Sequence, residues 1–301
     1  MEADRLVRLP GGARLSYLEA GSTTGRAVLV LHGTPSSRLE AGGPLGEVAA
    51  TLGLRILAPD RPGYGRTPFV AYDVGSYPEH MVGLLDALDI DEVGIVGVSG
   101  GGRYACACAV HLGPRVARTA LVASTAPSDL DGVRATWSKD DRQLYALAVR
   151  APWLLRSYLA VMARRIRRDP ARIPELFNDL PAEDEAVVAR PEVRQILATT
   201  MTEAFRQGTR GAVHDIALEA RPWGVDLGAI ATPVDLWHGH EDTLVAVPQA
   251  ESLARAIPTA NAQLLPGEGH LSLHVNHIRA ILEPFARSPP GSAAVDGGPS
   301  G

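Results

Sequence analysis

The sequence contains only two cysteines, Cys106 and Cys108, among its 301 residues. They lie two positions apart in a segment predicted to be helical, where side chains at positions i and i+2 point in different directions. A disulfide between them is therefore not expected, which is typical of a reducing compartment. We interpret both as small buried side chains that pack a helix against a sheet, rather than as a redox pair or metal ligands.

Long apolar runs and a leader-like N-terminus are also lacking. The first residues, MEADRLVRLPGG, hold no apolar core region and no cleavage-like site, and no apolar run reaches the length that spans a bilayer. The formal net charge is only -5, so nothing indicates a nucleic-acid partner. We expect a cytoplasmic protein without a membrane partner, acting as a monomer or homodimer on a small molecule.

Strand-like and helix-like segments alternate over the first part of the chain. Such alternation predicts an α/β fold with a mostly parallel sheet covered by helices. The expected strands are 14–19, 27–31, 54–58, 93–98 and 118–123, and the expected helices are 45–52, 74–88 and 103–112.

From residue 127 to residue 223 the pattern changes to helical periodicity without convincing strands, which predicts an inserted helical cap. Its expected helices are 141–149, 153–167, 187–189 and 193–205, and afterwards strands at 234–238 and 263–265 alternate with helices at 250–256 and 278–285. The predicted organisation is thus a core of residues 1–126 and 224–287 interrupted by the cap 127–223. Residues 288–301, rich in glycine, proline and serine, are predicted to be a disordered tail.

The residues Gly97 to Gly102 spell GVSGGG directly after the apolar run 93–98 and before the expected helix 103–112. This is a G-x-S-x-G sequence in a strand, turn and helix context. A serine hydroxyl becomes an effective nucleophile when a sharp turn exposes it and a base lies beside it, and only residues without bulk fit around such a turn. Ser99 is therefore the candidate nucleophile.

Three further groups complete a candidate catalytic site. His32-Gly33-Thr34-Pro35 follows the strand 27–31, and the amides of Thr34 and Gly100 would form an oxyanion hole. The alternative is that HGTP is merely a turn, since glycine and proline are common in loops. Asp242 follows the strand 234–238, and His270 lies on a glycine-flanked loop after the last strand. The order Ser99, Asp242, His270 is the order expected of a triad on an α/β-hydrolase sheet.

Together the motifs HGTP, DRPGYGRT at 60–67, GVSGGG, PWG at 222–224, LWHGHED and PGEGHLSL resemble the α/β-hydrolase superfamily over residues 5 to 286. The resemblance implies an eight-stranded, mostly parallel sheet with the cap after the sixth strand. It also implies Ser99 as nucleophile, His270 as base, Asp242 as the residue that orients it, and hydrolysis through an acyl-enzyme. No metal or cofactor is expected.

Several alternatives remain open at this level. Asp129 or Glu241 could replace Asp242 as the triad acid. The run His238-x-His240-x-Asp242 is similar to a metal-ligand pattern but lacks the next histidine, and His270, His274 and His277 fall at helical spacing. The arginines at 164–168 are interpreted as a solvated helix end, although an anionic substrate or a membrane surface would also attract them.

The candidate substrate pocket is drawn from the oxyanion loop and the cap. It comprises His32, Gly33, Trp137 and Trp223, and Trp153, Tyr158, Met162, Met201 and Phe205 could also line it, with packing inside the cap as the simpler role for each. The predicted function is a serine hydrolase that cleaves an ester or related acyl compound of a small apolar molecule. Alternatives are carbon–carbon bond hydrolysis, acyl transfer, peracid formation or cyclisation by the same triad, and a non-catalytic receptor for small ligands. A dinucleotide oxidoreductase is disfavoured because the glycines do not match G-x-G-x-x-G.

Overall fold

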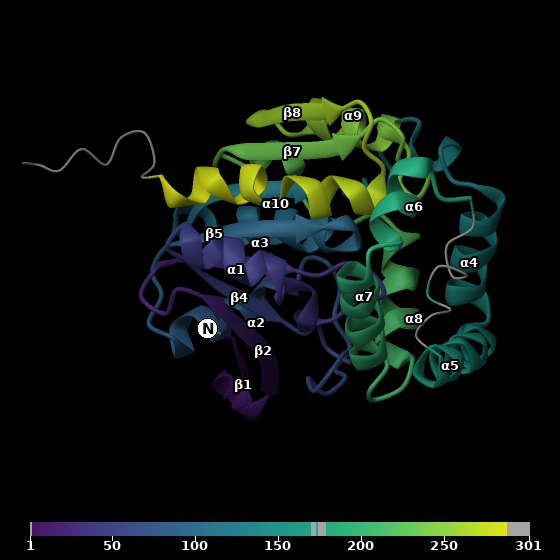
Figure 1. The fold of residues 1–301 in the computed structure, drawn as a ribbon, viewed down its shortest axis with the longest axis horizontal. Helices are drawn as coiled ribbons and strands as arrows, with labels where there is room; N and C mark the ends of the chain where they lie inside the picture. Colours follow the sequence, from purple (N-terminus) through teal and green to yellow (C-terminus); the bar gives the residue numbers. More distant parts are fainter. Residues whose placement is uncertain (1, 170–172, 174–178, 288–301) are drawn as a thin grey trace, which may run out of the picture.

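A computed structural model describes residues 2–169, 173 and 179–287. Its centre is an eight-stranded sheet in the order β1-β2-β4-β3-β5-β6-β7-β8 (Figure 1). β2 pairs antiparallel with β1 and β4, and all other neighbours are parallel, which confirms the predicted sheet. The strands are β1 (Ala3–Arg8), β2 (Arg14–Gly21), β3 (Arg26–Leu31), β4 (Leu54–Pro59), β5 (Val93–Val98), β6 (Val116–Val122), β7 (Val234–Gly239) and β8 (Ala260–Leu265).

The central strands are apolar on both faces because helices cover both faces of the sheet. Val28 and Val30 of β3 pack into a core with α1 (Pro44–Thr51) and α10 (His270–Ala286), whereas Leu29 and Leu31 pack into a second core on the opposite face. The helices of that opposite face are α2 (Pro78–Ala87), α3 (Gly102–Leu112) and α9 (Val247–Ala256).

Both cysteines lie in α3 as predicted. Neither forms a disulfide, and both are buried in the core between α3 and the sheet. Burial raises the pKa of the Cys106 thiol to about 12. A thiol of such high pKa is unreactive near neutral pH, so these residues contribute packing.

Among the described residues, five α-helices lie between β6 and β7 and form what we call the helical insertion. They are α4 (Lys139–Arg150), α5 (Pro152–Arg168), α6 (Ala182–Val188), α7 (Pro191–Ala204) and α8 (Arg210–Glu219). Figure 1 shows them gathered beside the edge of the sheet toward which the β7 and β8 arrows point. Their position after the sixth strand agrees with the predicted cap, whose exact boundaries stay a prediction. The predicted tail 288–301 lies outside the described residues, among which no helix is both long and apolar enough to cross a membrane.

Four elements differ from the sequence-based expectation. The helix expected at 187–189 is α6, which spans Ala182–Val188. β1 was not predicted, because three of its six residues are charged and most of them are exposed, so that pairing with β2 at the sheet edge stabilises it. Helix α8 was not predicted either. The expectation for the last helix was wrong at its start, because α10 begins at His270 and not at residue 278.

Candidate active site

Ser99 stands at the turn between β5 and α3, with a φ of 51°. This left-handed conformation is uncommon for a residue with a side chain and costs energy, so the surrounding structure must hold it in place. A Cβ atom on Gly101 would collide with the carbonyl oxygen of Leu31, and one on Gly97 would lie 2.7 Å from Cβ of Ala105. The glycines therefore allow β5 and α3 to approach closely while the turn presents Ser99.

Two hydrogen bonds connect Ser99, His270 and Asp242. His270 Nε2 lies 3.1 Å from Ser99 Oγ, and His270 Nδ1 lies 2.8 Å from Asp242 Oδ2. Because the carboxylate only accepts, Nδ1 carries the proton and Nε2 accepts from the serine hydroxyl. The other oxygen of Asp242 accepts the N–H groups of Leu244 and Val245 at 2.9 and 2.7 Å, which fixes the carboxylate.

The electrostatics of this pair follow from burial and mutual attraction. Burial lowers the pKa of His270, but the charge and hydrogen bond of Asp242 outweigh it, and the pKa lies above the ordinary value. Burial likewise tends to raise the pKa of Asp242, while His270 and His238 hold it below its usual range. Asp242 is thus a carboxylate that stabilises a protonated His270.

The residues predicted to form the oxyanion hole lie against each other. A Cβ atom on Gly100 would lie 3.5 Å from the backbone nitrogen of Thr34, and one on Gly33 would lie 3.5 Å from Cβ of Ser99. The Gly33 N–H donates to Glu40 Oε2 at 3.1 Å, whereas within residues 2–169, 173 and 179–287 the Thr34 N–H has no hydrogen-bond acceptor. The loop after β3 therefore brings a backbone donor to the turn that carries Ser99.

A buried ionic cluster holds this loop from behind, and the sequence analysis missed it. Asp215 of α8 is fully buried and lies 2.7 Å from Arg61 and 3.7 Å from Arg103. Arg61 donates to the carbonyl of Gly33 at 2.8 Å and to Thr34 Oγ1 at 3.0 Å. Asp215 also accepts the hydroxyl groups of Thr34, Tyr64, Tyr72 and Tyr104. Arg61 belongs to the recognised DRPGYGRT motif, but no local pattern marks Asp215.

Of the predicted pocket residues, only Gly33 lies against Ser99. The His32 ring is fully buried, with Nδ1 donating to the Gly33 carbonyl at 2.9 Å and Nε2 accepting the Arg61 N–H at 3.3 Å. Trp223 is buried in the core beside α3, and Trp137 packs edge-on against Tyr145 of α4. The structure therefore gives these three rings supporting roles. His32 holds the loop after β3 through its hydrogen bonds, whereas the apolar surfaces of Trp223 and Trp137 are covered by the core and by α4.

The remaining aromatic and methionine side chains of the insertion also do not gather around Ser99. Trp153 and Tyr158 are 68% and 62% exposed on the outer side of α5. Met201 and Phe205 are buried in two separate apolar clusters of the insertion, and Met162 packs against both of these clusters.

The alternative acids and the metal-like run are also placed. Asp129 is exposed, and Glu241 accepts the Gly267 N–H at 3.2 Å, so Asp242 alone among the three contacts His270. His238 is buried and donates to the Val245 carbonyl at 2.8 Å, while His240 is exposed. In the part of the chain that the structure describes, no three His, Cys, Asp or Glu side chains are arranged to hold a metal ion.

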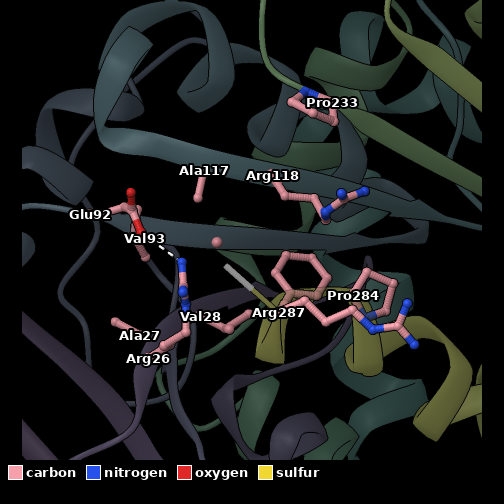
Figure 2. A pocket seen from close by; sticks show the side chains of 12 residues that line it. Arg26, Ala27, Val28, Glu92, Val93, Ala117, Arg118, Pro233, Pro284 and Arg287 are labelled. Atoms are coloured by element: carbon pink, nitrogen blue, oxygen red, sulfur yellow. Dashed lines mark hydrogen bonds and ion pairs between the residues drawn. The ribbon is translucent and has the colours of Figure 1, made fainter. Parts of the chain in front are cut away.

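A cavity of about 740 Å³ lies away from this site (Figure 2). Its lining residues come from the amino ends of β3, β5 and β6 and from the end of α10, with Arg26 paired to Glu92 at 2.8 Å. Ser99 follows the carboxyl end of β5, so the length of a strand, roughly 20 Å at about 3.3 Å per residue, separates the two. The cavity therefore lies at the amino ends of the parallel strands, whereas Ser99 lies at their carboxyl ends.

Comparison with known proteins agrees with this geometry. A model described as the alpha/beta hydrolase family matches residues 28–283. The 2-hydroxymuconate semialdehyde hydrolase of Pseudomonas putida is 26% identical over 282 residues, which cover 92% of this chain and 92% of that protein. The 2-hydroxy-6-oxo-2,4-heptadienoate hydrolase of Pseudomonas putida is 33% identical over 142 residues, or 45% of this chain and 50% of that protein.

Solved structures share the fold. An alpha/beta hydrolase fold protein from Nakamurella multipartita superimposes with a TM-score of 0.68 at 24% identity, covering 94% of this chain and 99% of that one. An esterase from Rhodococcus sp. ECU1013 gives 0.65 at 20% identity, with 95% and 99% coverage. Since the family model spans both parts of the core, the insertion and the residues Ser99, Asp242 and His270, this chain belongs to the alpha/beta hydrolase family.

Proposed function

We propose that this protein is a serine hydrolase that cleaves an ester or related acyl compound of a small apolar molecule through an acyl-enzyme. The observation that carries the proposal is the hydrogen-bonded series Ser99, His270 and Asp242, with distances of 3.1 and 2.8 Å. A serine hydroxyl with an oriented imidazole beside it is the arrangement of an activated nucleophile.

The proposed reaction runs in two halves. Ser99 Oγ attacks the acyl carbon while His270 Nε2 takes its proton, and the amides of Thr34 and Gly100 donate to the oxyanion that forms. The carbon bond to the leaving group breaks as His270 returns the proton to that group. Water then attacks the acyl-enzyme in the same way and releases the acid and Ser99. Asp242 holds the imidazole in the required tautomer and stabilises its charged form.

The charges around the site favour a neutral substrate. Arg61 and Arg103, whose guanidinium groups contact Thr34, are both paired with carboxylates of α8. The carboxylate of Glu40 lies 3.8 Å from the position a Cβ on Gly33 would take, next to Ser99. An anionic substrate at this place would meet a carboxylate, so an uncharged ester fits better.

Carbon–carbon bond hydrolysis is the second candidate, because three relatives have names that point to it. Neither 2-hydroxymuconate semialdehyde nor 2-hydroxy-6-oxo-2,4-heptadienoate contains an ester, so water must break a carbon–carbon bond beside a carbonyl in them. The same nucleophile, base and oxyanion donors would serve such a reaction. Both named substrates are acids, however, and the carboxylate of Glu40 beside Ser99 disfavours them here.

The test is intact-mass spectrometry after incubation with a fluorophosphonate. Wild type is expected to gain one adduct, mapped to Ser99, and the Ser99→Ala and His270→Ala variants are expected to gain none. Ser99→Ala should also lose at least about a thousandfold in ester turnover while keeping its fold. Ser252→Ala, which removes a buried hydroxyl of α9, is the matched control and should label like wild type.

The outcomes separate the candidates. Folded wild type without an adduct contradicts the proposal and favours a ligand-binding protein. An adduct together with turnover of a vinylogous 1,5-diketone, but not of short acyl esters, assigns the triad to carbon–carbon hydrolysis. An adduct with turnover of neutral esters supports the proposal as stated.

A further inference from the structure

The start of α10 is held by a side chain from the helical insertion. The residue before the helix, Gly269, has no side chain to cap the exposed N–H groups. Asp184 of α6 supplies the acceptors. Its Oδ2 accepts the His270 N–H at 2.9 Å, and its Oδ1 accepts those of Leu271 and Ser272 at 2.9 and 2.8 Å.

This contact is built into both elements. Asp184 is fully buried, and a Cβ atom on Gly269 would lie only 2.5 Å from its Oδ1. Glycine before His270 therefore makes room for the carboxylate. Beside it, Val187 and Val188 of α6 form one buried apolar cluster with Leu271 of α10, which keeps the two helices in register.

The Asp184 carboxylate contacts the backbone of His270, the proposed base. A negative group at a helix N-terminus interacts favourably with the helix dipole and with the free N–H groups, so the backbone of His270 is fixed in position. The charged and titratable groups around the imidazole are Asp242, Asp184 of α6, Glu40, His238 of β7 and His274 of α10. Burial lowers the pKa of His270, while Asp242, Asp184 and Glu40 raise it.

We propose that Asp184 is a positioning residue for His270, fixing the backbone from which the imidazole reaches Ser99 and supporting its charged form during turnover. The inference rests on the proposed function in so far as His270 is the base there. It makes α6 a supporting part of the catalytic site. An opening of the insertion that lifted α6 from α10 would also release the base.

The test compares wild type with Asp184→Asn, which keeps an oxygen acceptor but removes the charge. The imidazole pKa of His270 is measured by NMR titration, with its signal identified by its loss in His270→Gln. We expect Asp184→Asn to lower that pKa, because a negative charge that favours the imidazolium is gone. We expect kcat for an ester to fall about ten- to hundredfold, the size of effect found when residues that orient metal ligands are replaced, and KM to change little. The fall of kcat/KM on the acid side of its pH profile should move to lower pH.

Two more variants keep the proposal testable if charge removal disturbs the fold. Gly269→Ala displaces the carboxylate without removing it and should lower kcat without abolishing folding. Ser138→Ala removes the N-terminal cap of α4 in the same insertion and should lower thermal stability while leaving the titration and kcat unchanged. The proposal would be overturned if Asp184→Asn and Gly269→Ala unfold at a lower temperature but keep the wild-type pKa of His270, the wild-type acid side of the kcat/KM profile and the wild-type kcat. Because the titration needs no turnover, a failure of Ser99 to react with fluorophosphonate is recognised separately.

Discussion

At the residue scale, the two nitrogens of the His270 ring have opposite hydrogen-bond roles, one as donor and one as acceptor. Nδ1 faces a carboxylate that only accepts, so Nε2 is left to accept the Ser99 proton. The same carboxylate raises the pKa of the imidazole against the effect of burial. The residue is thereby made a stronger base than a free histidine, and it must be neutral before it can act.

This predicts the pH dependence of turnover. Since protonated His270 cannot accept the serine proton, kcat/KM should fall as pH decreases, with a midpoint above about 6.5, the ordinary value for histidine. A pH-rate profile of ester hydrolysis measures it. His277→Gln, on the same helix but paired with Glu268, should leave the midpoint unchanged. A rate that rises toward acid pH would contradict the assignment of His270 as base.

At the element scale, the site depends on how closely β5, the turn and α3 approach β3. The turn holds Ser99 in a strained conformation, and glycines on either side leave no side chain between the backbones. A methyl group at Gly101 would meet the carbonyl oxygens of Leu31 and His32. The approach of α3 to β3 therefore sets the place of both Ser99 and the oxyanion loop.

Gly101→Ala should accordingly move α3 away from β3. We expect a loss of about 1–3 kcal/mol in the free energy of unfolding, as for other overpacked interiors, and a lower rate of ester hydrolysis, because Ser99 and Thr34 separate. Urea denaturation and steady-state kinetics check both. Gly75→Ala, where the nearest atom to the new methyl lies at 3.5 Å, is the control. Wild-type stability and rate in Gly101→Ala would refute this account of the turn.

At the scale of the whole molecule, buried charges join the insertion to the core. Arg38 of the core pairs with Glu203 of α7 at 2.7 Å and with Asp60 at 2.8 Å. Asp215 of α8 pairs with Arg61 and lies beside Arg103. Breaking such a pair leaves an unpaired charge in a site of low dielectric constant, which is costly. Since separating the insertion from the core would break these pairs, the two parts should unfold as one unit.

Asp215→Ala tests this coupling. It leaves Arg61 without its carboxylate and removes the acceptor of three tyrosine hydroxyls. We expect a loss of about 3–5 kcal/mol in the free energy of unfolding and impaired hydrolysis, since Arg61 also holds Gly33 and Thr34. Asp86→Asn, which breaks an exposed pair with Arg115, should cost about 1 kcal/mol or less. Equal, small losses in the free energy of unfolding of both variants would show that the buried cluster does not couple the insertion to the core.

The sequence by itself predicted the alternation of strands and helices in the core, the mostly parallel sheet and the candidate residues Ser99, Asp242 and His270. It could do so because periodicity, glycine-rich turns and strand ends are local properties of the chain. The bounds of the central strands β3, β4 and β5 followed within one residue, whereas α10 began eight residues before the predicted start. β1 was missed because an exposed edge strand has no apolar alternation of its own.

Only the tertiary structure decided what supports that site. His270 was expected on a loop because glycines precede it. It begins α10 instead, and the cap of that helix comes from Asp184, 86 residues earlier in the chain. Asp215 and the arginines around it are likewise polar residues in ordinary surroundings until the fold buries them together. The indole rings of Trp137 and Trp223 pack against other side chains and do not lie in the predicted pocket. Contacts between distant segments depend on how helices and sheet meet in space, and no local pattern of residues records that.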